Sequence, residues 1–423
     1  MAAREGPRDG RLVTTAADAG RAALERAWRD ESPRILGAVA RTTGDLLLAE
    51  DAVQEAFARA VAEADRGRVP ANPAAWVTTV ARRVALDALR REQTAVRAAP
   101  ALAAEAALAS AAAATIEEDS VFTGDERLEL ILVVAHPELA PEARVELALR
   151  FVCGVPTGRI ADVFLVPEPT MAARLTRAKK RIHDARLRFA LDDPAAVAAR
   201  MPDALTTIYL LYTVGHQTVD ATLRRDAIEL ARDAHRVFAE AESAGLLALL
   251  LLTEARQSTR LTDGDEFATL READRRRWDA ALMAEGEALA TTALAGGGRY
   301  ALQAGIAGLH AIAPTWDATD WPAIVRLYDG LVRQWPSPSA RLGRIVALGH
   351  SPDAGPEVAM AALDADPALS VGVLETEAHA ARADLLRLAG RGTEAAEAYR
   401  AAIRSARDDR TARSLERLLA EAG

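Results

Sequence analysis

The sequence has one cysteine and no long hydrophobic run. Cys153 by itself excludes an internal disulfide and a cysteine-based zinc site. The most apolar run, Leu246–Thr253, is far too short to span a membrane, and Met1–Gly20 lacks the apolar core of a signal peptide. We therefore expect a soluble, cytoplasmic protein with no membrane partner.

Aromatic residues are also scarce, at 4% of the chain, although 50% of the residues are hydrophobic. Alanine and leucine supply most of that apolar content, and both favour helices over strands. No segment has a convincing strand pattern, so we predict an all-α fold. A chain of 423 residues exceeds the size of a single core, so we expect several domains.

Lysine is nearly absent, because only Lys179 and Lys180 stand among the 52 basic residues. The net charge of −9 argues against nucleic-acid binding, but the charge is unevenly distributed. Basic and acidic residues balance over residues 1–190, and residues 191–423 carry the whole excess of acids. Any DNA-binding surface must therefore lie in local basic patches of the first part of the chain.

The clearest local pattern is a helix-turn-helix between residues 157 and 188. A short helix over Thr157–Phe164 and the turn Leu165–Pro167 precede a long helix from about Glu168 to Arg188. Its expected core is Ile160, Ala161, Phe164, Leu165, Met171 and Leu175. Residues 171–188 carry a net charge of +6, which suits contact with DNA phosphates. A solvated basic face on an ordinary amphipathic helix is the alternative interpretation.

Two further helical segments are informative only together with this one. Residues 76–97 hold five arginines and follow a loop rich in Arg, Asn and Pro over residues 65–73. An apolar stripe of this helix runs through Trp76, Val80, Val84 and Leu89. Residues 45–60 form an acidic and apolar helix. Each segment alone is explained better as a solvated helix face.

Taken in order, these segments resemble an extracytoplasmic-function sigma factor of the sigma-70 family. The resemblance rests on DLLLAEDAVQEAFARA, PAAWVTTVARRVALDALRRE and APEARVELALRFVCGVPTGRIADVFLVPEPTMAARLTRAKKRI. It covers about residues 20–93 and 125–188. The segments IYLLYTVGH, EADRRRWDAALMAEGEAL and YALQAGIAGLHA are similar to the subgroup with a long C-terminal extension that ends in tetratricopeptide-like repeats.

The resemblance implies an all-α fold with two small sigma domains, the second with a helix-turn-helix, and a C-terminal helical, tetratricopeptide-like extension. The expected boundaries are an N-terminal tail over 1–19, sigma domain two over 20–94, an Ala-rich linker over 95–124, sigma domain four over 125–190, a helical extension over 195–295 and a tetratricopeptide-like region over 296–423.

The resemblance also implies roles for individual residues. Core polymerase would be bound by Asp51, Gln54, Glu55 and Phe57, although Phe57 could instead be buried. The minus-ten element would be bound by Arg66, Arg68, Asn72, Trp76, Arg82, Arg83 and Arg90, although Trp76 could equally be a core residue. The minus-thirty-five element would be bound by Thr170, Ala173, Arg174, Arg177, Lys179, Lys180 and Arg181. Ala172 and Ala173 stand where related proteins often have polar residues, so direct base readout would be sparse.

The implied partners are core RNA polymerase and promoter DNA. The acidic extension would contact a regulatory protein or another part of the same chain. The seven histidines show no HxH or HxxxH pair, and no catalytic set can be assembled, so we expect no metal, no cofactor and no enzyme activity. Two other interpretations stay open at this point: a helix-turn-helix regulator with a helical effector domain, and a helical-repeat scaffold that does not bind DNA.

Overall fold

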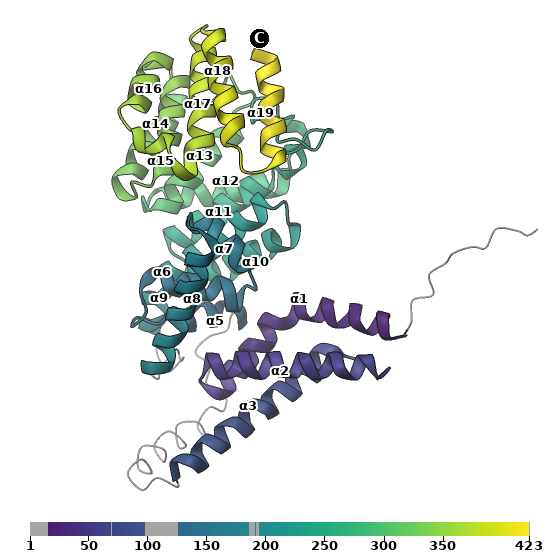
Figure 1. Ribbon diagram of the computed structural model, residues 1–423. Helices are drawn as coiled ribbons and strands as arrows, with labels where there is room; N and C mark the ends of the chain where they lie inside the picture. Colours follow the sequence, from purple (N-terminus) through teal and green to yellow (C-terminus); the bar gives the residue numbers. More distant parts are fainter. Residues whose placement is uncertain (1–15, 69, 98–125, 186–190, 192–193, 423) are drawn as a thin grey trace, which may run out of the picture. The chain divides into compact units, whose positions relative to one another are not determined.

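The computed structural model describes residues 16–68, 70–97, 126–185, 191 and 194–422, and these residues form helices joined by short loops (Figure 1). Within these ranges the only β pairing is an isolated antiparallel bridge between Leu261 and Phe267. The predicted all-α fold is confirmed. The chain divides into two compact units, Met1–Thr207 (unit 1) and Ile208–Gly423 (unit 2). The predicted tail and Ala-rich linker lie mostly outside the described residues.

Unit 1 begins with three mutually packed helices, α1 (Ala16–Thr43), α2 (Leu46–Asp65) and α3 (Pro73–Arg97). Side-chain hydrogen bonds cap the N-terminal ends of two of these helices. The Asp45 carboxylate accepts hydrogen bonds from the backbone N–H groups of Leu47 and Leu48, and so caps α2. The Asn72 side chain accepts one from the Ala75 N–H at 3.1 Å, at the start of α3.

Alanine dominates the contact faces of these helices. The helix α2 buries Ala49, Ala52, Ala56, Ala60 and Ala64. Small side chains on this face let α1 and α3 approach closely, and they leave the acidic residues of α2 on the opposite side.

The apolar stripe predicted for α3 is displaced by one residue. Val77, Ala81 and Ala85 are fully buried, whereas Trp76 and Val80 are only half-buried. The large side chains of the predicted stripe therefore flank the contact line. The buried line consists mostly of alanines, whose size suits a close helix contact.

The second part of unit 1 contains the predicted helix-turn-helix. Its elements are α5 (Glu126–Val134), α6 (Pro141–Leu147), the π-helical turn η1 (Ala148–Val152), α7 (Thr157–Phe164) and α8 (Glu168–Ala185). The bounds of α7 match the prediction. Ile160 and Met171 are fully buried and join α7 to α8, as expected.

The prediction that Leu165 belongs to this core is wrong. Its backbone adopts the left-handed conformation with φ of 60° at the C-terminus of α7, and its side chain is 49% exposed. The left-handed turn redirects the chain toward α8 and points this side chain outward.

The helix α9 (Pro194–Gln217) contains the boundary between the two units. Its first half is anchored to unit 1, because Arg144 pairs with Asp203 at 2.8 Å and Arg200 donates to the Leu132 carbonyl at 3.2 Å.

Unit 2 continues with helices that pack on their neighbours along the chain. They are α10 (Ala221–Val237), α11 (Ala241–Glu254), α12 (Ala280–Leu294), α13 (Arg299–Ile312), α14 (Trp321–Gln334), α15 (Pro338–His350), α16 (Gly355–Asp364), α17 (Glu375–Leu388), α18 (Gly392–Ser405) and α19 (Asp409–Ala422), with short 3-10 turns η2 (Gln257–Thr259), η3 (Arg275–Arg277), η4 (Pro367–Ser370) and η5 (Gly372–Leu374). Contacts between successive helices are typical of stacked helix pairs.

Two long-range ion pairs join distant segments of unit 2. The segment between α11 and α12 reaches the last helix, where Asp265 pairs with Arg410 at 2.9 Å and Glu272 pairs with Arg417. The last helix is thereby held to a segment about a third of the chain earlier.

Glycine allows a close approach of two helix backbones in unit 2. A Cβ at Gly245 in α11 would collide with the backbone of Tyr300 and Ala301 in α13. By contrast, a Cβ at Gly308 in α13 would meet only the Leu252 side chain, at an ordinary 3.9 Å. The spacing of α11 and α13 therefore depends on Gly245.

These two glycines give a matched test of the packing. We expect Gly245→Ala to lower the stability of unit 2 by about 3 kcal/mol, because the backbone of α13 cannot move aside for the added methyl group. Gly308→Ala should instead stabilise it by about 0.5–1 kcal/mol, because alanine is the better helix former. Thermal unfolding should show a lower Tm for the first variant and an equal or higher Tm for the second. Equal melting of both variants would contradict the packing argument.

Candidate nucleic-acid and protein interface

The helix α8 presents several of its predicted contact residues to solvent. Thr170, Ala173, Arg177, Lys180 and Arg181 are exposed. Among the described residues, Arg177 and Lys180 form no ion pair, so both charges are available to phosphate groups. Arg181 lies near Glu138 at 3.7 Å, with both side chains exposed, and that contact is weak.

Arg174 differs from its neighbours because it is held against the domain. Its guanidinium donates to the Glu146 carboxylate of α6 at 3.0 Å, and the Glu146 side chain is only 2% exposed. Burial raises the pKa of Glu146, and the hydrogen bond from Arg174 opposes that rise. The residue expected to reach DNA thus also neutralises a buried charge.

Lys179 makes two contacts within unit 1. Its ammonium group lies 2.7 Å from the Glu50 carboxylate of α2 and 4.5 Å from the centre of the Phe151 ring. The cation is therefore half-buried, between a carboxylate and an aromatic face. This ion pair links the predicted recognition helix to the helix predicted to bind polymerase.

The solvent face of α2 carries three of the four residues predicted to bind polymerase. Asp51, Gln54 and Glu55 are exposed. Gln54 donates to Glu50 at 3.2 Å, and Glu55 pairs with Arg59 at 2.9 Å. Together these side chains form an acidic strip suited to a basic partner.

Phe57, the fourth residue, is 6% exposed and faces the helix contact. Its ring packs edge-on against Trp28 of α1, with the ring centres 4.7 Å apart. Trp28 itself is 47% exposed, although its position in an apolar stripe indicates a core residue. The accessible aromatic side chain beside the acidic strip is therefore Trp28.

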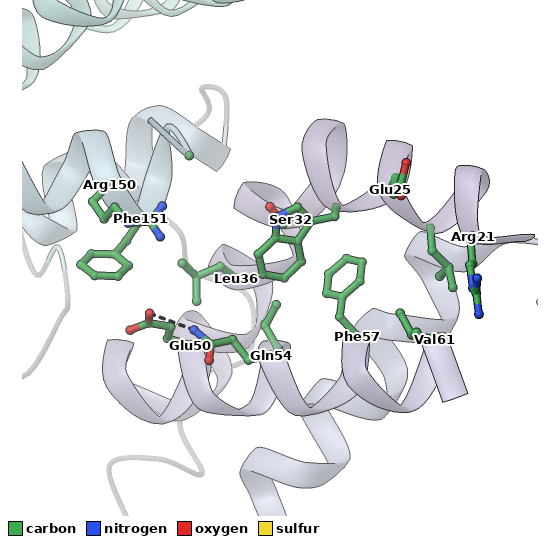
Figure 2. Close-up of a pocket in the computed structure, with 14 residues that line it drawn as sticks. Arg21, Glu25, Ser32, Leu36, Glu50, Gln54, Phe57, Val61, Arg150 and Phe151 are labelled. Atoms are coloured by element: carbon green, nitrogen blue, oxygen red, sulfur yellow. Dashed lines mark hydrogen bonds between the residues drawn. The ribbon is translucent and has the colours of Figure 1, made fainter. Parts of the chain in front are cut away.

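A groove of about 560 Å³ adjoins this strip (Figure 2). Phe57 and Leu36 line it from α2 and α1, and Arg150 and Phe151 border it from η1. Its walls are mainly apolar, and Glu50 and Gln54 stand at one side. The sequence pattern did not indicate this groove, because its walls come from segments far apart along the chain.

The loop before α3 contains predicted DNA contacts that are already engaged. Arg66 and Arg68 both pair with Glu63, at 2.8 and 2.6 Å. These contacts, led by the hydrogen bond from Arg68, lower the pKa of Glu63. The Asn72 carbonyl oxygen caps α3, which leaves its amide NH₂ group as a donor.

Along α3, Arg82 and Arg83 are exposed and form no ion pair among the described residues. Arg90 is also exposed and lies 3.5 Å from the Asp87 carboxylate. Trp76, in the first turn, is half-buried. Arg82 and Arg83 are therefore the cations of this helix most available to a polyanion.

No group of three or more His, Cys, Asp or Glu side chains in the described part of the chain is arranged to hold a metal ion. None of the helices in that part is long and apolar enough to cross a membrane.

Two family models match the parts of unit 1 that contain these residues. Residues 27–95 match the family model for sigma-70 region 2, and residues 129–182 match that for sigma-70 region 4. Residues 200–294 match a family of unknown function, DUF6596.

Two relatives extend the comparison. An uncharacterized protein, R00370, from Rhizobium meliloti (strain 1021) is 36% identical over 384 residues, which cover 88% of this chain and 89% of the relative. A probable ECF RNA polymerase sigma factor, SigI, from Mycobacterium tuberculosis (strain CDC 1551 / Oshkosh) is 27% identical over 164 residues, or 39% of this chain and 56% of SigI. No solved structure matches the chain.

The buried pair in α6 and α8 yields a pH-dependent prediction. We expect Arg174→Gln to destabilise the helix-turn-helix domain by about 2 kcal/mol at neutral pH, because it leaves a buried carboxylate unpaired while Arg174 itself is partly solvated. The folded-state pKa of Glu146 is raised, so this loss should shrink as the pH falls and the carboxylate becomes protonated.

Amide hydrogen exchange in α6 and α8, compared at about pH 7.5 and about pH 5, would measure this stability. The control is the double variant Glu146→Gln with Arg174→Gln, which removes both charges and should be more stable at neutral pH than Arg174→Gln alone. A loss that is the same at both pH values would show that Glu146 is not the cause.

Proposed function

We propose roles for these surfaces from one premise: the chain belongs to the extracytoplasmic-function sigma factors of the sigma-70 family, in the group with a C-terminal helical extension. It directs RNA polymerase to promoters and supports transcription initiation. Such factors act by binding core polymerase and promoter DNA. Because polymerase works in the cytoplasm, we place the action of this chain there.

The acidic strip of α2 is the proposed docking surface for core polymerase. Asp51, Gln54 and Glu55 are exposed and suit a basic partner surface. Trp28 offers an apolar anchor beside them, and exposed tryptophans are frequent hot spots in protein interfaces. Phe57 supports this surface from beneath by packing on Trp28.

The loop 66–72 and the helix α3 are proposed to hold the melted minus-ten strand. An unstacked base can be bound by side-chain donors such as the Asn72 amide group, and by Arg66 and Arg68 once they leave Glu63. Trp76 would lie near the melted strand. Arg82, Arg83 and Arg90 would bind its phosphates.

The helix α8 is proposed to bind the minus-thirty-five element. Thr170 and Ala173, near its start, would face base edges, whereas Arg177, Lys180 and Arg181 would bind phosphates. Arg174 and Lys179 would add contacts only as far as Glu146 and Glu50 release them. The observation that carries the whole assignment concerns Arg177 and Lys180 of α8. Both are exposed and form no ion pair within the described ranges, and they lie in the same unit as the exposed acidic strip of α2.

Two charge variants separate the proposed roles. Asp51→Arg with Glu55→Arg should weaken binding to core polymerase by about tenfold. Arg177→Gln with Lys180→Gln should leave core binding unchanged. It should weaken promoter binding by the holoenzyme and lower the slope of log affinity against log salt by about two.

Core binding by fluorescence anisotropy and run-off transcription would measure both effects. The matched controls, Glu397→Arg with Glu416→Arg and Arg326→Gln with Arg333→Gln, change exposed charges of unit 2 and should change neither binding step. Loss of core binding in the α8 variant would contradict the division of roles.

The extension after about residue 195 is proposed to be a regulatory or interaction module with tetratricopeptide-like helix pairs. Its excess of acids fits contact with a basic protein surface or with another part of the same chain, rather than with DNA. The run of contacts between successive helices supports the repeat-like character.

Packing variants in the intact chain test this regulatory role. Below its melting temperature, Gly245→Ala should change run-off transcript yield per assembled holoenzyme by about fivefold, a typical size for coupling between sites. Gly308→Ala, on the facing helix, should leave the yield unchanged. Wild-type yield from a chain with a demonstrably loosened α11–α13 contact would refute regulation by the extension.

A further inference from the structure

Four cationic or titratable side chains of unit 2 share neighbours although they are distant in sequence. Arg271 and His310 both contact the Trp316 ring, and the charges of Arg256 and Arg275 both act on His310. Arg256 follows α11, Arg271 and Arg275 lie in the segment before α12, and His310 is near the end of α13 (Figure 1). We call them the cationic cluster. None of them belongs to the surfaces assigned above to polymerase or promoter DNA.

The cationic cluster lacks the carboxylates that neutralise other arginines of unit 2. Arg224 pairs with Glu254 at 2.9 Å, and Arg344 pairs with Asp329 at 2.6 Å. In the described part of the chain, by contrast, Arg256, Arg271 and Arg275 form no ion pair.

Several polar atoms of the cluster are buried without a partner. Among the residues described, Nε and Nη2 of Arg275 and Nδ1 of His310 make no hydrogen bond. Nε of Arg256 donates to the Leu252 carbonyl at 3.0 Å. Buried polar atoms are nearly always bonded, so the unbonded ones on Arg275 and His310 point to a bound group.

Electrostatics favours a negative charge at this place. Burial, followed by the charges of Arg256 and Arg275, lowers the pKa of His310 to about 4. Burial also lowers the pKa of Arg256, and the charge of Arg275 adds to that effect. The positive charges of Arg256 and Arg275 therefore repel each other in a poorly solvated environment. A bound oxyanion would offset this repulsion.

Aromatic rings adjoin the cluster. The His310 ring stacks on Trp316 with centres 6.1 Å apart and meets Trp321 at 5.3 Å. The Arg271 guanidinium lies 5.4 Å from the Trp316 ring centre. His350 stacks on Trp321, meets the edge of Trp316, and is held by a hydrogen bond with Asp384 at 2.9 Å. The cluster thus offers both charge and a planar apolar surface.

We propose that the cationic cluster is a binding site for a small organic anion, whose phosphate or carboxylate group is held by Arg256 and Arg275 and whose planar part lies against Trp316. The site is independent of the sigma function, so its test needs neither polymerase nor promoter.

The test is calorimetric titration of the full chain with phenyl phosphate, benzoate and inorganic phosphate, at constant ionic strength set with sodium chloride. We expect saturable binding of at least one aromatic anion, tighter than that of inorganic phosphate. The stronger aromatic ligand identifies the anionic group as phosphate or carboxylate. Quenching of tryptophan fluorescence should accompany binding, because the planar part contacts Trp316.

Arg275→Gln should weaken that binding by about tenfold or more, the usual effect of losing a charge-assisted contact. Arg276→Gln is the matched control, because Arg276 lies on the same 3-10 turn but is exposed and paired with Asp274. Equal weakening by both variants, or no binding beyond that of chloride, would overturn the proposal.

If Arg275→Gln fails to fold, Arg271→Gln serves in its place, because Arg271 is exposed and contributes little to the core. It should weaken binding and reduce the fluorescence change. Unchanged binding in a folded Arg271→Gln chain would then overturn the placement of the ligand beside Trp316.

Discussion

Close approach between helices, made possible by alanine and glycine at the points of contact, is the constraint on which both units depend. The alanine face of α2 sets its distance from α1 and α3, and Gly245 sets the distance between α11 and α13. A chain with few aromatic residues gains its buried area in this way, from many small contacts rather than from a few large side chains. The functional side chains are then left on the opposite faces of the same helices.

Much of this fold could be predicted from the sequence, because helical periodicity and turn residues are local signals. The bounds of α7 follow from such signals. The buried line of α3 could not be found in the same way, since alanine is too weakly apolar to stand out beside Trp76 and Val80. The exposure of Leu165 depends on a left-handed backbone conformation that non-glycine residues seldom adopt.

The residue sets implied by resemblance lie on the predicted helices and in the loop before α3, but their pairing is set by the three-dimensional fold. Glu146 is distant from Arg174 in sequence, and Glu50 is farther still from Lys179, so neither partner is visible in a local pattern. The cationic cluster is the extreme case, because three separate segments supply it. The cations of α8 thus fall into two groups. Arg174 and Lys179 must leave a carboxylate before they can bind a phosphate, whereas Arg177 and Lys180 have no such partner among the described residues.

The ion pair of Glu146 and Arg174 links a residue of the proposed recognition helix to the stability of the domain. A sigma factor that diverges to bind a new promoter would change residues of its recognition helix. A change at position 174 alone, however, leaves the buried Glu146 carboxylate without its ion-pair partner. Substitution at 146 must therefore accompany or precede it. We therefore expect the two positions to vary together among related proteins. Thr170 and Ala173 are exposed and pair with no buried charge, so changes of promoter specificity should begin there more easily.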